Sequence, residues 1–204
     1  VEDRWRTENK LDASTRSALR PDSLSGRNRA RDASDILLTA SINQLLLDTF
    51  VVSWWAHGSP EVAMQMGLIN IETIALNSAI NGLVTAIASR ERPYRDQCVG
   101  EDATELEDCR SSKRYRSYYS GHTSTAFAVA GLTCMHHYHL PLYGGGAPDA
   151  LICAGGYAAA AATGLMRVVA DQHWISDVMT GAAMGTASGL LVPYLLHYRT
   201  GDLP

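Results

Sequence analysis

Three side chains between Met166 and Asp177 have the types and spacing of a reactive site. His173 and Asp177 are four residues apart, so on a helix they lie on one face. A carboxylate there can accept the proton of one imidazole nitrogen and leave a free lone pair on the other, which prepares a nucleophile. Arg167 adds a planar guanidinium suited to a cluster of anionic oxygens. Together they indicate phosphoryl chemistry; the alternative is a loop between two helices whose polar side chains face water.

The charges of this segment stand out because its surroundings carry almost none. Between Ser117 and Tyr198, the only Asp, Glu, Lys or Arg residues are Asp149, Arg167, Asp171 and Asp177. Three of these four lie in the segment. Charges placed so sparingly in an apolar setting are typical of functional sites.

A second group of candidate residues lies in the stretch from Tyr119 to Thr123. Ser120 is a helix N-cap, and Gly121 lets a ligand approach the backbone closely. The N–H groups of the helix turn that follows form an anion site. His122 is placed to give a proton to a departing alkoxide. Alone, this stretch is also what an ordinary capped helix with a surface histidine looks like.

A third motif, Arg90-Glu-Arg-Pro93, supplies the cation Arg92 next to a proline that ends the preceding helix. Alone, it reads equally as a basic helix end stopped by proline. The ordered combination Arg-Pro, Ser-Gly-His and Arg-x5-His-x3-Asp resembles the signature of the type 2 phosphatidic acid phosphatase superfamily, over residues 35–198. That superfamily includes membrane lipid phosphatases, soluble bacterial acid phosphatases and vanadium haloperoxidases. Its fold is a helical bundle with the site at one end.

The resemblance implies a role for each matching residue. The phosphoryl oxygens would be held by Arg92, Arg167, Ser120 and Gly121. His173 would attack phosphorus and form a phosphohistidine, and Asp177 would orient it. His122 would protonate the leaving oxygen and then activate water. No metal or other cofactor is implied, and vanadate would act as an inhibitor that mimics five-coordinate phosphorus.

Three positions depart from the family pattern. Thr85 stands where the family has a lysine, Tyr119 replaces a proline and Met166 replaces a serine. Losing the lysine removes a cation from the expected phosphate clamp. The candidates to compensate for it are Arg90, Lys113 and Arg114.

Five long apolar runs predict an all-α helical bundle. They cover residues 35–56, 63–88, 123–136, 150–169 and 178–198. The first two are long enough to cross a bilayer. The last three are rich in Ala, Gly, Ser and Thr, which favours the close packing common among membrane helices. The segregation of charge favours a transmembrane bundle over a soluble one, which is the alternative.

The polar segments divide the chain further. We expect an N-terminal arm at residues 1–34, the phosphatase-like bundle at 35–198 with an active-site loop at 89–119, and a tail at 199–204. The arm carries eight Lys or Arg residues. It is interpreted as an amphipathic helix on a membrane surface or as a solvated arm, and the solvated arm is favoured. The loop holds seven cations and seven acids.

The four cysteines match no zinc-binding spacing. Cys98 and Cys109 lie in the polar loop and indicate either a short disulfide, which would place the loop outside the cytoplasm, or two free thiols. Cys134 and Cys153 lie in apolar runs and are predicted to be small core residues.

The favoured function is a metal-independent phosphatase acting on the phosphate or diphosphate end of a lipid. It would be embedded in a membrane with its site on the extracytoplasmic face, although eight arm cations on that face conflict with the positive-inside rule. The alternatives are, in order, a soluble periplasmic acid phosphatase of broad specificity, a vanadium haloperoxidase and a non-catalytic relative that binds lipid head groups. A net charge of −4 without a basic face gives no case for nucleic acid as a partner.

Overall fold

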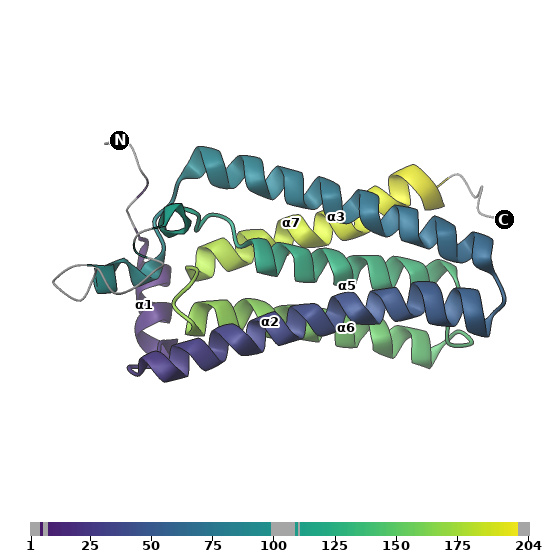
Figure 1. The fold of residues 1–204 in the computed structure, drawn as a ribbon, viewed down its shortest axis with the longest axis horizontal. Helices are drawn as coiled ribbons and strands as arrows, with labels where there is room; N and C mark the ends of the chain where they lie inside the picture. The colour runs from purple at the N-terminus through teal and green to yellow at the C-terminus, as the bar shows by residue number, and fades with distance from the viewer. Residues whose placement is uncertain (1–4, 6–7, 99–108, 110, 200–204) are drawn as a thin grey trace.

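The computed structural model describes residues 5, 8–98, 109 and 111–199, so the tail from residue 200 and much of the predicted loop lie outside the described residues. Five long helices run side by side, and a short one crosses one end of the bundle (Figure 1). The elements are α1 (Lys10–Leu19), α2 (Leu24–Leu46), the π-helical η1 (Leu47–Ala56) that continues α2, α3 (Pro60–Ala88), the short 3₁₀ helices η2 (Pro93–Cys98) and η4 (Ser112–Tyr115), α5 (Gly121–His139), α6 (Ala147–Val169), α7 (Ile175–Pro193) and its π-helical continuation η5 (Tyr194–Tyr198). The predicted all-α bundle is confirmed. The expected boundary between residues 34 and 35 falls inside α2.

Local sequence signals set the helix ends. The Ser23 hydroxyl accepts a hydrogen bond from the backbone N–H of Gly26 and caps α2. Pro60 begins α3, where its missing N–H costs nothing. Ser89 ends α3 in the left-handed region, at φ 43°. The chain reverses direction after each long helix. As a result, the C-terminus of α3, the N-terminus of α5 and the turn between α6 and α7 lie together at the end of the bundle crossed by α1 (Figure 1).

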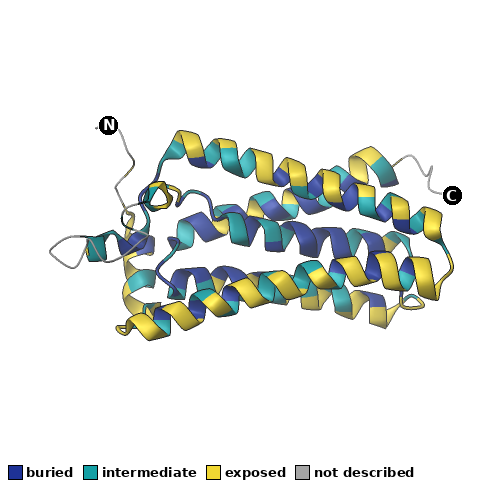
Figure 2. Ribbon diagram, viewed as in Figure 1, coloured by how far each residue is buried: buried dark blue, intermediate teal, exposed yellow. Residues whose placement is uncertain are grey.

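Helix α5 forms the centre of the bundle, and its side chains are mostly buried (Figure 2). It packs against α2, α3, α6 and α7. The crossing with α7 is very close: a Cβ added at Gly185 would lie 2.1 Å from the carbonyl oxygen of Ser124, and one at Gly189 would lie 2.3 Å from that of Ala128. The small residues predicted to favour close helix packing therefore do so at this crossing.

The outer helices expose apolar side chains rather than bury them (Figure 2). Ile87 on α3 is 75% exposed and Leu151 on α6 is 71% exposed. Four helices in the described part of the chain are long and apolar enough to cross a membrane: Leu24–Ala56, Pro60–Ala88, Ala147–Val169 and Ile175–Tyr198. An apolar exterior of this extent is what a lipid-facing bundle requires.

Five spans were expected from the apolar runs, and α5 is the one whose composition is not apolar enough to count as a span. Its position explains the difference. Because neighbouring helices surround α5, its side chains face protein rather than lipid and can be more polar.

Helix α1 is anchored to the bundle rather than solvated. Asp12 is 1% exposed. Arg16 and Arg20 form ion pairs with Asp171, with N–O distances of 2.7 and 2.8 Å. The favoured interpretation of a solvated arm is therefore wrong for α1, because its charges bind groups at the end of the bundle.

All four cysteines are paired. Cys98 and Cys109 form a disulfide with Cα atoms 5.5 Å apart, as one of the two interpretations of the loop expected. Cys134 and Cys153 form a second disulfide with Cα atoms 4.7 Å apart, so the prediction that they are small core residues is wrong. Helices α5 and α6 form a hairpin, which brings these two positions together (Figure 1).

Candidate active site

The three sequence motifs meet at the end of the bundle crossed by α1. His173 lies in the turn between α6 and α7, Arg167 in the last turn of α6, His122 in the first turn of α5 and Arg92 just after α3. Burial lowers the pKa of His173 well below its usual value, and the nearby Arg92 lowers this pKa further, as do His122 and Arg167. His173 is thus a neutral imidazole at neutral pH, gathered with the other motif side chains.

A backbone carbonyl orients His173. Its Nδ1 lies 2.8 Å from the carbonyl oxygen of Ser117, whereas the nearer Asp177 oxygen is 3.9 Å away. Because a carbonyl only accepts hydrogen bonds, Nδ1 carries the proton and Nε2 keeps its lone pair. The state expected for a nucleophile is present, but the direct Asp177–His173 hydrogen bond that the spacing suggested is replaced by one to Ser117.

Asp177 acts on His173 through Ser117. Its carboxylate accepts hydrogen bonds from the Ser117 hydroxyl at 2.5 Å and from the backbone N–H of Trp174 at 3.0 Å, and it is paired with Arg90. Asp177 thus holds the Ser117 side chain, and the backbone carbonyl of the same Ser117 holds the imidazole of His173. Asp177 is a positioning residue in this arrangement.

Two of the three cations named as candidates to replace the family lysine are paired with carboxylates of the protein. Arg90 is 1% exposed and bridges Asp12, at 2.6 Å, and Asp177. Arg114 donates to Glu91 at 2.6 Å. Lys113 is exposed on η4. The structure therefore places Arg90 and Arg114 in ion pairs with carboxylates of the protein.

Thr85, at the position of the family lysine, is buried and lines a cavity of about 370 Å³. Arg116 from the loop before α5 lines the same cavity. Its carbonyl oxygen accepts a hydrogen bond of 3.4 Å from Arg92. The cation beside the altered position is thus Arg116, which the motifs did not identify.

The N-cap of α5 forms as predicted, but its groups bind the protein. The Ser120 hydroxyl accepts a hydrogen bond from the backbone N–H of Thr123 at 3.4 Å, and Ser120 is fully buried. A Cβ at Gly121 would lie 2.9 Å from the side-chain oxygen of Asn81. The close approach of Asn81 on α3 therefore favours glycine at this position, independently of any ligand that approaches the backbone.

Helix α2 contributes two residues that the motifs missed. The Ser34 hydroxyl accepts from Nε of Arg167 at 2.8 Å, and the Asp35 carboxylate accepts from Nη2 of Arg167. The same Asp35 oxygen lies 3.2 Å from Nε2 of His122. Ser34 and Asp35 are more than 80 residues from either partner in the chain, and no local pattern marks them.

The turn that carries His173 is held from α1. Asp171, two residues before His173, has φ 60°, a left-handed conformation that few residues other than glycine adopt. Its carboxylate accepts hydrogen bonds from Arg16 at 2.7 and 2.9 Å and from Arg20 at 2.8 Å. Charge-assisted bonds of this kind hold the backbone in an uncommon conformation next to the candidate nucleophile.

This arrangement suits displacement at an anionic centre. A neutral imidazole supplies a lone pair, two arginines supply positive charge and a second histidine can exchange a proton. Among the described residues, no three His, Cys, Asp or Glu side chains are grouped as metal ligands would be.

Comparison with known proteins finds a relative in sequence and a solved structure with a similar fold. A lipid A 1-phosphatase from Porphyromonas gingivalis is 47% identical over 75 residues, which are 37% of this chain and 15% of that protein. The chain therefore matches only a small part of that relative's length. The crystal structure of the first transmembrane PAP2 type phosphatidylglycerolphosphate phosphatase from Bacillus subtilis superposes with a TM-score of 0.64 and 17% identity, covering 94% of this chain and 85% of that one. This second likeness shows a shared fold.

The family assignment rests on the C-terminal two-thirds of the chain. The PAP2 superfamily model matches residues 67–201, which include all three motifs and the helices α5, α6 and α7 that carry most of the site. Helices α1 and α2 precede the matched residues. The chain belongs to the PAP2 superfamily, as the resemblance of its motifs predicted.

Proposed function

We propose that this protein is a membrane-embedded phosphatase that removes a terminal phosphate from a lipid phosphate or diphosphate. The observation that carries the proposal is the neutral, buried His173, whose Nδ1 is bound to the Ser117 carbonyl and whose neighbours include Arg92 and Arg167. The PAP2 family and the name of the Porphyromonas gingivalis relative support a phosphorylated lipid as substrate.

The proposed reaction has two displacements. The Nε2 lone pair of His173 attacks phosphorus, the bond from phosphorus to the lipid oxygen breaks, and that oxygen takes a proton from the imidazolium form of His122. Water then attacks the phosphohistidine while His122 accepts a water proton, and the P–N electrons return to Nε2. Arg92 and Arg167 stabilise the charge on the equatorial oxygens throughout, which supplies most of the rate gain in phosphoryl transfer. The scheme uses no metal or other cofactor.

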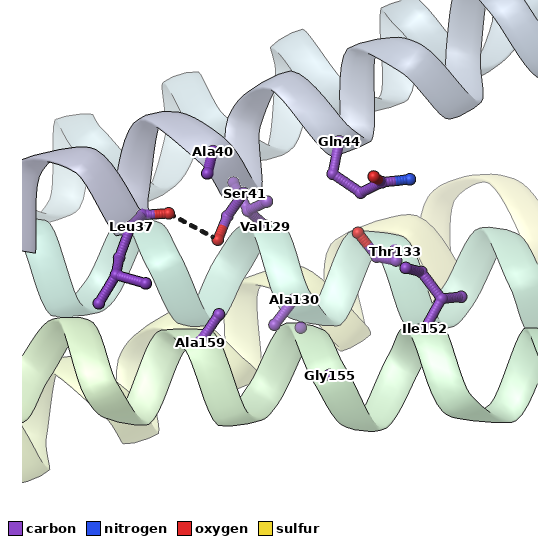
Figure 3. A pocket seen from close by; sticks show the side chains of 11 residues that line it. Leu37, Ala40, Ser41, Gln44, Val129, Ala130, Thr133, Ile152, Gly155 and Ala159 are labelled. Atoms are coloured by element: carbon purple, nitrogen blue, oxygen red, sulfur yellow. Dashed lines mark hydrogen bonds between the residues drawn. The ribbon is translucent and has the colours of Figure 1, made fainter.

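An apolar groove supports a lipid substrate. It lies between α2, α5 and α6 and has a volume of about 210 Å³ (Figure 3). Leu37 at its rim is two residues from Asp35, and Ala130 on its floor is eight residues from His122, about 12 Å along a helix. Gln44 and Thr133 place polar groups at its far end (Figure 3). An acyl chain attached to a phosphate at Arg167 can follow this groove.

We also propose that the site faces the extracytoplasmic side. The Cys98–Cys109 disulfide follows η2 at the end of the bundle that holds His173. Disulfides persist mainly in oxidising compartments.

Phosphate release from a small panel tests the function. The purified protein in detergent is incubated with phosphatidate, a polyprenyl diphosphate and p-nitrophenyl phosphate. One set of reactions contains EDTA, and a separate set without EDTA is run with or without vanadate. We expect release that survives EDTA, is inhibited by vanadate and is fastest with a lipid. A preference for p-nitrophenyl phosphate would favour a general acid phosphatase, and release from no substrate would refute the proposal.

Filling the groove should select against lipids. A Cβ at Gly155 meets nothing within 4 Å, so the backbone at this position accepts a side chain, and Gly155→Leu adds an isobutyl group to the lining of the groove. We expect at least about a tenfold loss of kcat/KM for a long-chain lipid phosphate, because acyl burial contributes about 0.8 kcal/mol per CH₂. Turnover of p-nitrophenyl phosphate should be unchanged. Ala158→Leu, exposed on the same helix and outside the groove, is the control; equal losses on both substrates would contradict the assignment.

A further inference from the structure

Asp35 places a carboxylate among the cations that the proposed mechanism assigns to phosphate. Its Oδ1 accepts from Nη2 of Arg167 and lies 3.2 Å from Nε2 of His122. These are the two side chains that would bind the phosphoryl group and protonate the leaving oxygen. A negative charge at this position repels a phosphate while it neutralises the guanidinium that should attract one.

The exposure of the two partners differs sharply. The Asp35 side chain is 51% exposed, whereas that of Arg167 is 5% exposed. Arg167 is also held from behind, because its Nε donates to Ser34 at 2.8 Å and the Ser34 hydroxyl in turn donates to the Thr163 carbonyl at 3.0 Å. The guanidinium is therefore fixed, and the carboxylate on its outer side has room to rotate into solvent.

We propose that Asp35 is an internal anion that competes with the phosphoryl group for Arg167 and His122, and that it thereby raises the binding energy that any phosphate must supply to occupy the site. This inference rests on the proposed function of the same site. A lipid phosphate gains additional binding from the groove that begins at Leu37, half a turn beyond Asp35, and uses it to displace the carboxylate. Inorganic phosphate gains no binding from the groove, so it leaves the site readily after the reaction. Soluble phosphates therefore compete poorly with a lipid phosphate for the site.

Asp35 lies outside the residues matched by the family model, which begin at residue 67. The competition is thus assigned to α2 of this chain rather than to the three motifs. Asp35 acts through Arg167 and His122 and lowers the affinity of the site for phosphate without a bond to the reacting atoms.

The test is the affinity of the full-length protein for inorganic phosphate, measured by titration calorimetry without turnover. Asp35→Asn keeps the shape of the side chain and removes its charge. We expect its Kd for phosphate to fall by roughly tenfold or more, the size of a charge-assisted contact. Asp35→Glu, which keeps the charge, should retain the wild-type Kd. Asp32→Asn, an exposed change of equal charge one turn earlier on α2, should also leave it unchanged.

Kinetics separate this role from simple support of His122. With p-nitrophenyl phosphate, competition predicts a lower KM and a lower Ki for phosphate in Asp35→Asn, whereas support of His122 predicts a lower kcat with both constants unchanged. The second pattern would overturn the inference. So would an unchanged or weaker affinity for phosphate, or no binding of phosphate by Asp35→Asn at millimolar concentration. Failure of the wild-type protein to release phosphate would refute the proposed function alone, because the calorimetric comparison needs no turnover.

Discussion

Replacing His173 with Ala is expected to lower the rate of phosphate release by a factor of roughly 10⁴ or more, as loss of a nucleophile does in other enzymes. The imidazole is buried and neutral, and its Nδ1 is bound to the Ser117 carbonyl. Among the neighbouring side chains described, Arg92 and Arg167 are cations and His122 is assigned to proton transfer, so none of them takes over the role of this lone pair. Binding of vanadate should persist in the variant, because both arginines remain.

Two quantities are measured: the initial rate of phosphate release, and the covalent labelling of the protein by a ³²P-phosphorylated substrate. The stability of the label is compared in acid and in base. The wild-type protein should show transient base-stable labelling, the behaviour of a phosphohistidine, and His173→Ala should show none. His197→Ala is the matched control, because His197 pairs with Glu72 near the opposite end of the bundle. Activity of His173→Ala within tenfold of the wild-type rate would exclude the assigned nucleophile.

Replacing Asp12 with Ala should destabilise the protein by about 3–5 kcal/mol, the usual effect of breaking a buried ion pair at one partner. Although burial alone would raise the pKa of Asp12, hydrogen bonds from Ser176 and Arg90 lower it, so the group is a carboxylate. Its two oxygens accept from the backbone N–H of Ser176 at 3.0 Å, the Ser176 hydroxyl at 2.9 Å and Arg90 at 2.6 Å. Removing the carboxylate leaves a buried guanidinium with one carboxylate partner fewer and the backbone N–H of Ser176, in the first turn of α7, without its acceptor.

Heat inactivation in detergent measures this effect. A loss of this size corresponds to a fall in the midpoint on the order of 6–20 °C for a chain of this length. Lys10→Ala, an exposed change on the same helix, is the control. The double variant Asp12→Ala/Arg90→Met should lose less than the sum of the single changes, because the uncompensated charge is removed. A midpoint of Asp12→Ala equal to that of the control would show that α1 does not support the site.

Much of the site could be predicted from short motifs, because those motifs sit at helix ends that the fold brings together. Ser120 caps α5 as its type and position indicated. Arg167 and His173 lie on either side of a turn at the same end. Spacing alone was a weaker guide to which side chains pair. His173 and Asp177 are four residues apart, but His173 lies in the turn before α7 and Asp177 lies in α7, so the two do not share one helical face.

The missed contacts have two physical causes. The orienting group of His173 is a backbone carbonyl, which every residue has, so its identity carries no signal in the sequence. Asp12 and Asp35 act on residues far along the chain, and only the packing of α1 and α2 brings them there. The Cys134–Cys153 bond belongs to the same class, since it depends on the alignment of two helices rather than on spacing.

The central position of α5 has a consequence for how the protein is made. Among the long helices of the described chain, α5 is the one that lacks the apolar composition of an independent span. A segment of this kind is poorly partitioned into lipid on its own, because insertion depends on the summed hydropathy of the helix. It needs neighbours that cover its polar groups. We therefore expect α5 to stay at the translocon until α6 and α7 have emerged from the ribosome. The helix that carries His122 would then enter the bilayer together with the helices on either side of His173.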